Sequence, residues 1–232
     1  MKKALSLTEI LITLGIIGIV ASLTIPVITI NIQKEIAIKQ LKTSFNTLSN
    51  AIELAKTYYD GQLILTDEMK DGGIELFLTT FIDPYIKDIK FWTPKHVSLR
   101  GVSGATNNFN GYNSRWRCVK NGMCYYGLVQ GSRHADGTAF FNYIYLMVDT
   151  NGIDKGPNKK GRDFFYMNVD TEKDSVISLS HKNYDFRYAK PQTYENIKNS
   201  SCNPANESYW NGVSCFALIV MDNWKIGKDY PW

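Results

Sequence analysis

The feature that most constrains this chain is an apolar run near its N-terminus. Residues 10–33 contain no Asp, Glu, Lys or Arg, and most of them are aliphatic. A helix needs about 20 such residues to cross the hydrocarbon core of a bilayer, so this run is long enough to span it once. No other stretch approaches that length and apolarity. The sequence therefore predicts one membrane-spanning helix and excludes a protein with several spans.

The charges around the run predict its orientation. Lys2 and Lys3 precede it, and positive residues favour the cytoplasmic side of a span, so the chain beyond the run is expected to be exported. A secretory signal peptide fits poorly, because its apolar region is only about 7–15 residues long. An uncleaved signal anchor is the simpler alternative. Glu9 argues against it, because an acid within an apolar helix is costly and usually serves a purpose.

The residues at the start of the run form a motif. The leader Met1-Lys2-Lys3-Ala4 is followed by Leu5-Ser6-Leu7-Thr8-Glu9, the aliphatic run and Pro26. This order closely resembles the class III signal of type IV pilins and type II secretion pseudopilins. It departs from the commonest family form at Ala4, where glycine is usual, and at Leu5, where phenylalanine is usual. The C-terminal residues 212–232 also resemble, more weakly, the tail of a group of bacterial pseudopilin-like proteins.

The resemblance implies processing and assembly residues. A prepilin peptidase would cleave between Ala4 and Leu5, and the new Leu5 amine would be methylated. Glu9 would neutralise the Leu5 ammonium of a neighbouring subunit inside the filament, where an unpaired charge is costly. Because Gly18 and Pro26 weaken a helix, we hypothesise that the segment between them unwinds when a subunit leaves the bilayer for a filament.

Beyond the run, apolar residues recur at alternating spacings of three and four, which is typical of one face of a helix. The members of this stripe are Ile38, Leu41, Phe45, Leu48, Ile52, Ala55 and Tyr59. One helix is therefore predicted from about Leu5 to about Tyr58. Residues 1–4 are the leader, residues 5–33 the membrane and filament-core segment, and residues 34–59 its amphipathic continuation.

Residues 60–232 are predicted to form the exported globular domain. Runs of β-branched and aromatic residues predict strands at 139–148, 164–169 and 215–221. A second helix is expected within residues 75–90, broken at Asp83-Pro84, and the Gly-, Asn- and Ser-rich residues 100–117 are expected to be an irregular surface loop. The predicted fold class is α+β, with a long N-terminal helix packed on a small antiparallel sheet, as in pilins.

The four cysteines are predicted to form disulfides in the C-terminal part of the domain, because an exported domain meets an oxidising environment. They are Cys118, Cys124, Cys202 and Cys215. Three connectivities exist, and proximity in sequence favours Cys118–Cys124 and Cys202–Cys215. A zinc site is disfavoured, because there is no Cys-x-x-Cys pair and the histidines at 96, 134 and 181 are scattered.

A glycine-rich loop at residues 149–163 is a candidate cation site. Ca²⁺ takes 6–8 oxygen ligands, which Asp149, Asn151, Asp154 and Asp163 could supply together with backbone carbonyls. The loop is not an EF-hand, because Gly152 falls at the fourth place and no glutamate closes it. The alternative, which the sequence favours, is a tight β-connection held by Asx turns, with the basic residues of the loop opposing a cation.

The sequence contains no motif of a known catalytic site. There is no P-loop, dinucleotide-binding glycine motif, Gly-x-Ser-x-Gly or His-Glu-x-x-His. We therefore expect no catalytic residue and no cofactor apart from the Ca²⁺ considered above. An envelope enzyme on a signal anchor is one rival class. A DNA-uptake or adhesive minor pilin that binds a ligand at the filament tip is another, with basic residues 155–162 and the aromatic content as its weak basis for nucleic-acid binding.

These features together predict a non-enzymatic structural subunit of a pseudopilus or pilus. By the resemblance, it would lie in the bacterial inner membrane with a cytoplasmic N-terminus. Its partners would be a prepilin peptidase, an inner-membrane assembly platform, and copies of itself and other pilins or pseudopilins through the N-terminal helix. We favour a type II secretion-like machine, although the signal is shared by every branch of the superfamily.

Overall fold

The structure is a computed structural model of the whole chain. It describes residues 6–70, 73–92, 97–104, 106–109, 115–133, 139–170, 175–178, 193–208 and 211–232. The leader, the cleavage-site residues Ala4 and Leu5, and the three histidines lie outside the described residues. The chain forms two compact units, Met1–Ala37 and Ile38–Trp232.

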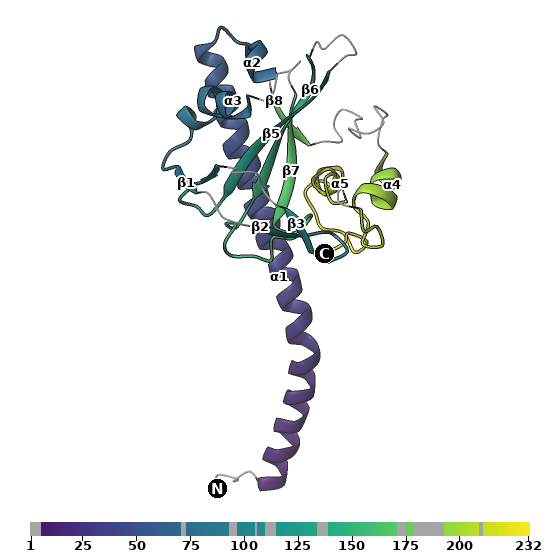
Figure 1. The fold of residues 1–232 in the computed structure, drawn as a ribbon. Helices are drawn as coiled ribbons and strands as arrows, with labels where there is room; N and C mark the ends of the chain where they lie inside the picture. Colours follow the sequence, from purple (N-terminus) through teal and green to yellow (C-terminus); the bar gives the residue numbers. More distant parts are fainter. Residues whose placement is uncertain are drawn as a thin grey trace. The chain divides into compact units, whose positions relative to one another are not determined.

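One helix, α1 (Leu7–Tyr58), extends over 52 residues, and this confirms the long helix predicted from the apolar pattern (Figure 1). Pro26 lies inside α1 and does not end it. The helix ends where Asp60 and Gly61 take left-handed conformations with φ of 50° and 86°. The Gly61 amide donates to the Lys56 carbonyl at 2.9 Å, so it closes the last turn of the helix.

In the second unit, α1 buries the predicted apolar stripe. Leu41, Leu48, Ile52 and Ala55 are fully buried and belong to the main hydrophobic core, with Ile38 and Phe45 partly buried against it. Tyr59 is 37% exposed, because it follows the last residue of the helix. The spacing of three and four therefore predicted the packing face of this segment correctly.

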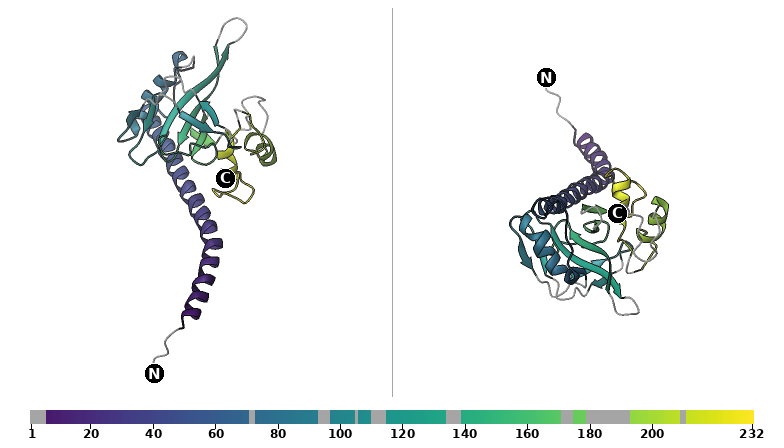
Figure 2. Two further views of the ribbon diagram at one scale, coloured as in Figure 1. Left: turned by 60° about the horizontal axis from the view of Figure 1, so that its bottom comes forward. Right: turned by 90° about the horizontal axis from the view of Figure 1, so that it is seen from above.

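An antiparallel sheet forms the centre of the second unit. Among the described residues it has six strands in the order β1-β4-β5-β6-β7-β8. The strands are β1 (Lys90–Trp92), β4 (Trp116–Cys118), β5 (Cys124–Arg133), β6 (Ala139–Asp149), β7 (Phe164–Asp170) and β8 (Ser175–Ser178). A separate pair joins β2 (Val97–Arg100) to β3 (Thr106–Phe109). Figures 1 and 2 show β5 and β6 as a long twisted hairpin.

Both faces of the sheet are buried, whereas the sequence predicted one apolar face under a helix. Tyr125, Leu146 and Phe165 lie in the main core with α1, and their neighbours in sequence lie in a second cluster on the other face. That second cluster includes Trp116, Tyr126, Tyr145, Met147, Phe164 and Tyr166, packed with Val97 and Leu99 of β2. Double burial explains why residues 164–169 form an almost continuous apolar run.

The predicted strand at residues 215–221 is wrong, because these residues form the helix α5 (Cys215–Met221). Its first five residues, from Cys215 to Ile219, are all buried. A short run that is buried on every side has no helical or strand periodicity, so the pattern alone could not distinguish the two structures. The helix begins at the disulfide-bonded Cys215 and is followed by a turn at Asn223 and Trp224, two residues with positive φ.

Besides α5, the described residues form five other short helices. They are α2 (Asp67–Lys70), α3 (Ile74–Phe81), η1 (Asp83–Tyr85), α4 (Tyr194–Asn196) and η2 (Ile197–Ser201). The break predicted at Asp83-Pro84 is confirmed, since α3 ends before it and η1 contains it. The irregular loop predicted at 100–117 is only partly right, because β3 and the start of β4 lie within it and Trp116 is fully buried.

A buried arginine connects the sheet to α3 and η1. The Nε atom of Arg117 lies 3.0 Å from both carboxylate oxygens of Asp83, and its terminal nitrogens lie 3.2 and 2.7 Å from the carboxylate oxygens of Glu75. Tyr125 donates its hydroxyl to Asp83 Oδ1 at 2.9 Å, and burial raises the pKa of that hydroxyl. The Arg117 side chain is 0% exposed, so these two acids supply the charge that balances it.

Candidate functional site

The first candidate site is the part of α1 in the N-terminal unit. Its large aliphatic side chains are exposed, from Leu7 at 74% to Ile36 at 50%. In the part of the chain that the structure describes, α1 is the one helix long and apolar enough to cross a membrane. Exposed aliphatic surface of this extent marks contact with lipid or with other protein. Length and composition therefore make α1 a candidate membrane anchor and assembly surface.

Glu9 closes the N-terminus of α1 through a reciprocal contact with Ser6. The amide and hydroxyl of Ser6 donate to Glu9 Oε2 at 2.8 and 3.0 Å, and the Glu9 amide donates to Ser6 Oγ at 3.2 Å. This is a capping box, in which side chains satisfy amide groups that the first helical turn leaves free. Our reading of the sequence missed it, although the spacing Ser6-x-x-Glu9 was a sufficient signal.

The residues proposed to unwind α1 have no packing role within a single chain. Pro26 is exposed, and a methyl group at Gly18, or at Gly15 one turn before it, would meet no atom within 4 Å. Hydroxyls along the same segment donate to carbonyls one turn back, as Thr13 does to Glu9 and Thr24 to Val20, both at 2.9 Å. Such bonds hide polar groups in an apolar environment. The glycines and these hydroxyls therefore leave the surface of α1 free for contact with apolar partners.

The second candidate site is the loop at residues 149–163, which joins β6 to β7. Asp149 Oδ1 accepts the amides of Asn151 and Gly152 at 3.2 and 2.7 Å. Asp163 Oδ1 accepts the amide of Lys159 at 2.6 Å. Asp163 Oδ2 accepts the amide of Asn158 at 3.0 Å and the side-chain amide of Asn151 at 3.3 Å. The loop thus folds around its first and last carboxylates.

Three of the four predicted ligands are joined by hydrogen bonds, and the fourth, Asp154, is exposed although its charge acts on Asp149. Asp149 and Asp163 are 0% and 4% exposed, and Asn151 is hydrogen-bonded to both, whereas Asp154 is exposed. Asn158 joins the cluster through Asp163 and was missed by our sequence analysis. In the described residues, no group of three or more His, Cys, Asp and Glu side chains has the arrangement of a metal cluster. Any cation here would need amide oxygens as ligands.

Burial disfavours the charged form of the two buried carboxylates of the loop. Burial, with the neighbouring Asp163, raises the pKa of Asp149 to about 7. Burial also raises the pKa of Asp163, although its hydrogen bonds act in the opposite direction. Two of the four basic residues of the loop pack on aromatic rings: Lys160 is 1% exposed against the Tyr166 ring, and Arg162 stacks on Trp232, whereas Lys155 is exposed. These positions weaken the basis for nucleic-acid binding.

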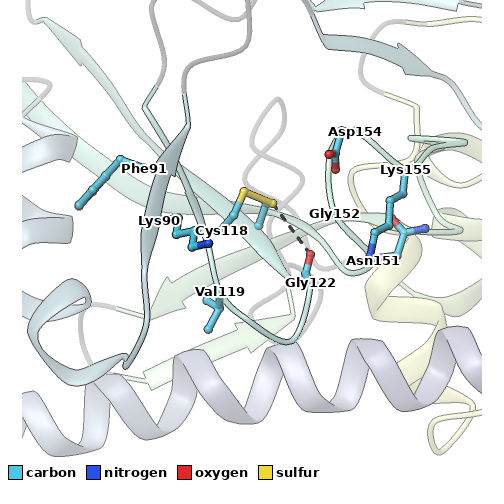
Figure 3. A pocket seen from close by; sticks show the side chains of 10 residues that line it. Lys90, Phe91, Cys118, Val119, Gly122, Asn151, Gly152, Asp154 and Lys155 are labelled. Carbon is cyan, nitrogen blue, oxygen red and sulfur yellow. Dashed lines mark hydrogen bonds between the residues drawn. A yellow bond between two sulfur atoms is a disulfide. The ribbon is translucent and has the colours of Figure 1, made fainter.

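A pocket of about 320 Å³ lies between this loop and the β4–β5 turn. Figure 3 shows Lys90 and Phe91 on one side of it, the Cys118–Cys124 disulfide in the middle, and Asp154 and Lys155 on the other side. The turn and the loop approach closely at two glycines with positive φ, Gly122 and Gly152. A Cβ at Gly122 would lie 3.2 Å from the Asn151 carbonyl oxygen, so larger residues do not fit without movement.

The loop also contacts the C-terminal disulfide. Gly161 has a φ of 81°, and a Cβ there would lie 2.9 Å from Cys215 Sγ. Tyr230 donates its hydroxyl to the Gly161 carbonyl at 2.6 Å. The observed disulfides, Cys118–Cys124 and Cys202–Cys215, are the pairs that proximity favoured. One loop therefore packs against residues held by both disulfides.

No protein-family model matches the chain, and neither a curated protein nor a solved structure matches it. The class of protein is therefore argued from the fold and the sites alone. A long apolar N-terminal helix, an antiparallel sheet and two disulfides are compatible with a pilin-like architecture and a membrane anchor.

Proposed function

We propose that this chain is a structural subunit of a bacterial envelope filament, a pseudopilin of a type II secretion-like machine in the type IV pilin superfamily. The observation that supports this most strongly is α1 itself. One continuous helix exposes aliphatic side chains along its first half and contributes buried residues to the core of an α+β domain along its second half. A soluble enzyme does not require this exposed aliphatic surface. A subunit that resides in a bilayer and is then polymerised does require it.

The proposal assigns two successive environments to the exposed half of α1. In the inner membrane its side chains contact lipid, with the N-terminus cytoplasmic and the domain exported. In the filament they contact the same segment of neighbouring subunits, so the helix remains apolar on all sides in both states. The two disulfides support export, because such bonds persist in oxidising compartments.

Processing by a prepilin peptidase between Ala4 and Leu5, followed by methylation, creates the charge that the filament needs. In the single chain, the Glu9 carboxylate accepts hydrogen bonds from the amide and hydroxyl of Ser6, the residue that precedes α1. We propose that in the filament the Leu5 ammonium of a neighbour becomes its ion-pair partner. A buried pair of this kind sets the axial register, because any other register leaves a charge unpaired. The further partners are other pilins or pseudopilins and an inner-membrane assembly platform, and the subunit is not an enzyme.

Glu9→Gln is expected to reduce filament assembly by about tenfold or more while leaving processing intact, because a neutral amide cannot neutralise the neighbouring ammonium. Full-length protein would be expressed with a prepilin peptidase and the assembly machine, and sheared filaments would be quantified against membrane-retained subunit. Ser6→Ala is the matched control. It removes the two contacts of the Ser6 hydroxyl, leaves the backbone contact of residue 6 with Glu9, and keeps the charge of Glu9, so it should assemble at near wild-type levels.

The pair of variants separates the two roles of Glu9. If Glu9 only caps α1, Ser6→Ala should impair assembly at least as much as Glu9→Gln. Wild-type assembly by Glu9→Gln would contradict the ion-pair role directly. A DNA-uptake or adhesive subunit would show the same dependence on Glu9, and it would be distinguished by a salt-dependent shift of labelled DNA, which we do not expect.

A further inference from the structure

The two disulfides of the domain differ in their surroundings. Cys202 and Cys215 are 1% and 0% exposed, and the Gly161 backbone packs on Cys215 so closely that a Cβ there would lie 2.9 Å from its Sγ. Cys118 is partly exposed, and with its partner Cys124 it lines the pocket of about 320 Å³ beside the β4–β5 turn (Figure 3). We call this bond the pocket disulfide. A thiolate must reach a sulfur atom to break a disulfide, so the two bonds differ in their access to thiols.

The strand register places a cation beside the pocket disulfide. Cys118 in β4 lies directly opposite Cys124 in β5 and also directly opposite Lys90 in β1. Residues paired in this way have their side chains on the same face of a sheet, with Cβ atoms about 4.5–5.5 Å apart. Lys90, Cys118 and Cys124 therefore form one row across three strands, and Figure 3 shows Lys90 next to Cys118.

A second cation reaches the pocket from the loop at residues 149–163. A Cβ at Gly122 would lie 3.8 Å from Lys155 Nζ, so this ammonium lies over the β4–β5 turn. Asp154 also lines the pocket, so two cations and one anion surround the disulfide. The reacting species in disulfide exchange is a thiolate, which is an anion, and the net positive charge of the pocket attracts it.

We infer that the pocket disulfide is a site of thiol–disulfide exchange with a dithiol protein of the thioredoxin class, which presents a Cys-x-x-Cys motif. A thiolate of that motif attacks Cys118 Sγ, the bond between the two sulfurs breaks, and Cys124 leaves with the electron pair and takes a proton from water. The second cysteine of the motif then attacks the mixed disulfide and releases Cys118 as a thiol. The motif is oxidised to a disulfide, and this chain is reduced by two electrons. Attack falls on Cys118 because Cys124 is 3% exposed.

The β4–β5 turn can remain folded after reduction, because backbone hydrogen bonds also hold it. The Val119 amide donates to the Met123 carbonyl at 2.8 Å, and the Gly122 amide donates to the Val119 carbonyl at 2.9 Å. The Gly122 carbonyl oxygen lies 3.9 Å from Cys124 Sγ, so it can accept a hydrogen bond from the new thiol (Figure 3). The ladder keeps the two cysteines opposite each other, so the bond can form again. This inference concerns the second unit alone and is independent of the proposed filament function.

The test follows the reduction of both disulfides in one folded sample. Full-length oxidised protein in detergent micelles is incubated with dithiothreitol, quenched with acid and alkylated, and the cysteine peptides are quantified by mass spectrometry. We expect Cys118–Cys124 to be reduced at least about tenfold faster than Cys202–Cys215, because thiols reach it without unfolding of the domain. Equal rates, or faster reduction of Cys202–Cys215, would overturn the inference.

Charge variants distinguish attraction of the thiolate from loosening of the turn. Lys90→Gln and Lys155→Gln should each slow reduction of the pocket disulfide by about two- to threefold at low salt, and Asp154→Asn should accelerate it by a similar factor. Loosening of the turn would instead accelerate the reaction in all three variants. Lys225→Gln changes an exposed lysine outside the pocket lining and should leave the rate unchanged. Unchanged or faster reduction in both lysine variants would refute the role assigned to the pocket charges.

The attacked sulfur is identified with a thioredoxin-like protein whose second motif cysteine is replaced by serine, so that the mixed disulfide cannot be resolved. We expect this protein to be trapped on Cys118. A link to Cys124 would overturn the assignment of the attacked sulfur. Absence of any link, under conditions in which dithiothreitol reduces the pocket disulfide, would overturn the assignment of a dithiol protein as the partner.

Discussion

Arg117→Met is expected to lower the free energy of unfolding by about 3–5 kcal/mol, the usual cost of removing one partner from a buried ion pair. The variant leaves the Asp83 carboxylate, which is 11% exposed, with the Tyr125 hydroxyl in place of a balancing charge. Glu75 is 48% exposed and can be solvated, so most of the loss comes from Asp83. Thermal unfolding of the full-length protein in micelles should show a fall in Tm of about 6–20 °C.

Two controls make the Arg117 prediction specific. Arg117→Met combined with Asp83→Asn should recover much of the loss, because the second change removes the unpaired charge. Lys70→Met breaks an ion pair with Asp67 in which the two side chains are 41% and 103% exposed. It should change the free energy of unfolding by less than about 1 kcal/mol. A Tm for Arg117→Met within about one degree of the Lys70→Met value would contradict the assigned role.

Phe216→Ala is expected to lower the free energy of unfolding by about 3–5 kcal/mol, because it opens a cavity in the main core. Phe216 is 1% exposed, and its ring centroid lies 5.8 Å from that of Phe45 in α1 and 6.5 Å from that of Phe165 in β7. Phe216 therefore packs α5 against both the long helix and the sheet. Loss of the near-UV signal at a lower temperature or denaturant concentration measures the effect.

Met221→Ala is the matched control for Phe216, since both residues belong to α5 and Met221 is 42% exposed. It should cost less than about 1 kcal/mol. Similar losses for the two variants would mean that α5 does not pack as observed. Trp224, whose ring centroid lies 5.6 Å from that of Phe216, supplies a fluorescence signal from the same cluster.

The long helix was predictable because its two halves carry different and extended patterns. Residues 10–33 lack charge altogether, and the stripe from Ile38 to Ala55 keeps its spacing for several turns. Over such lengths, periodicity separates a helix from a strand. The strands at 139–148 and 164–169 were predictable from β-branched and aromatic content, and the structure confirms them as β6 and β7.

The errors have a shared physical cause. Residues 215–221 are apolar because α5 is enclosed on nearly all sides, and Trp116 and Arg117 are buried although their neighbours are polar. Burial of this kind depends on residues far away in the sequence, such as the acids of α3 and η1 that balance Arg117. Local composition carries no information about those partners.

The candidate sites were predictable where their residues are close in sequence, and not where they depend on the path of the backbone. Asp149, Asn151 and Asp163 were found because acids and amides gather in one short loop. The exposure of Asp154 and the participation of Asn158 depend on the path of the backbone between them, which composition does not specify. The capping contact of Glu9 with Ser6 was not predicted, although it is local and its spacing in the sequence is the signal for it.

Mass spectrometry of the N-terminal peptide, from protein extracted from its native cell envelope, tests the proposed function most directly. The account predicts a mature chain that begins at Leu5 and carries one added methyl group on its amine. Glu9 would then be the fifth residue and would face the new ammonium of a neighbouring subunit. A chain that begins at Met1, or one that begins beyond Pro26, would contradict processing as a pilin-like subunit and would favour a signal anchor or a secretory signal peptide instead.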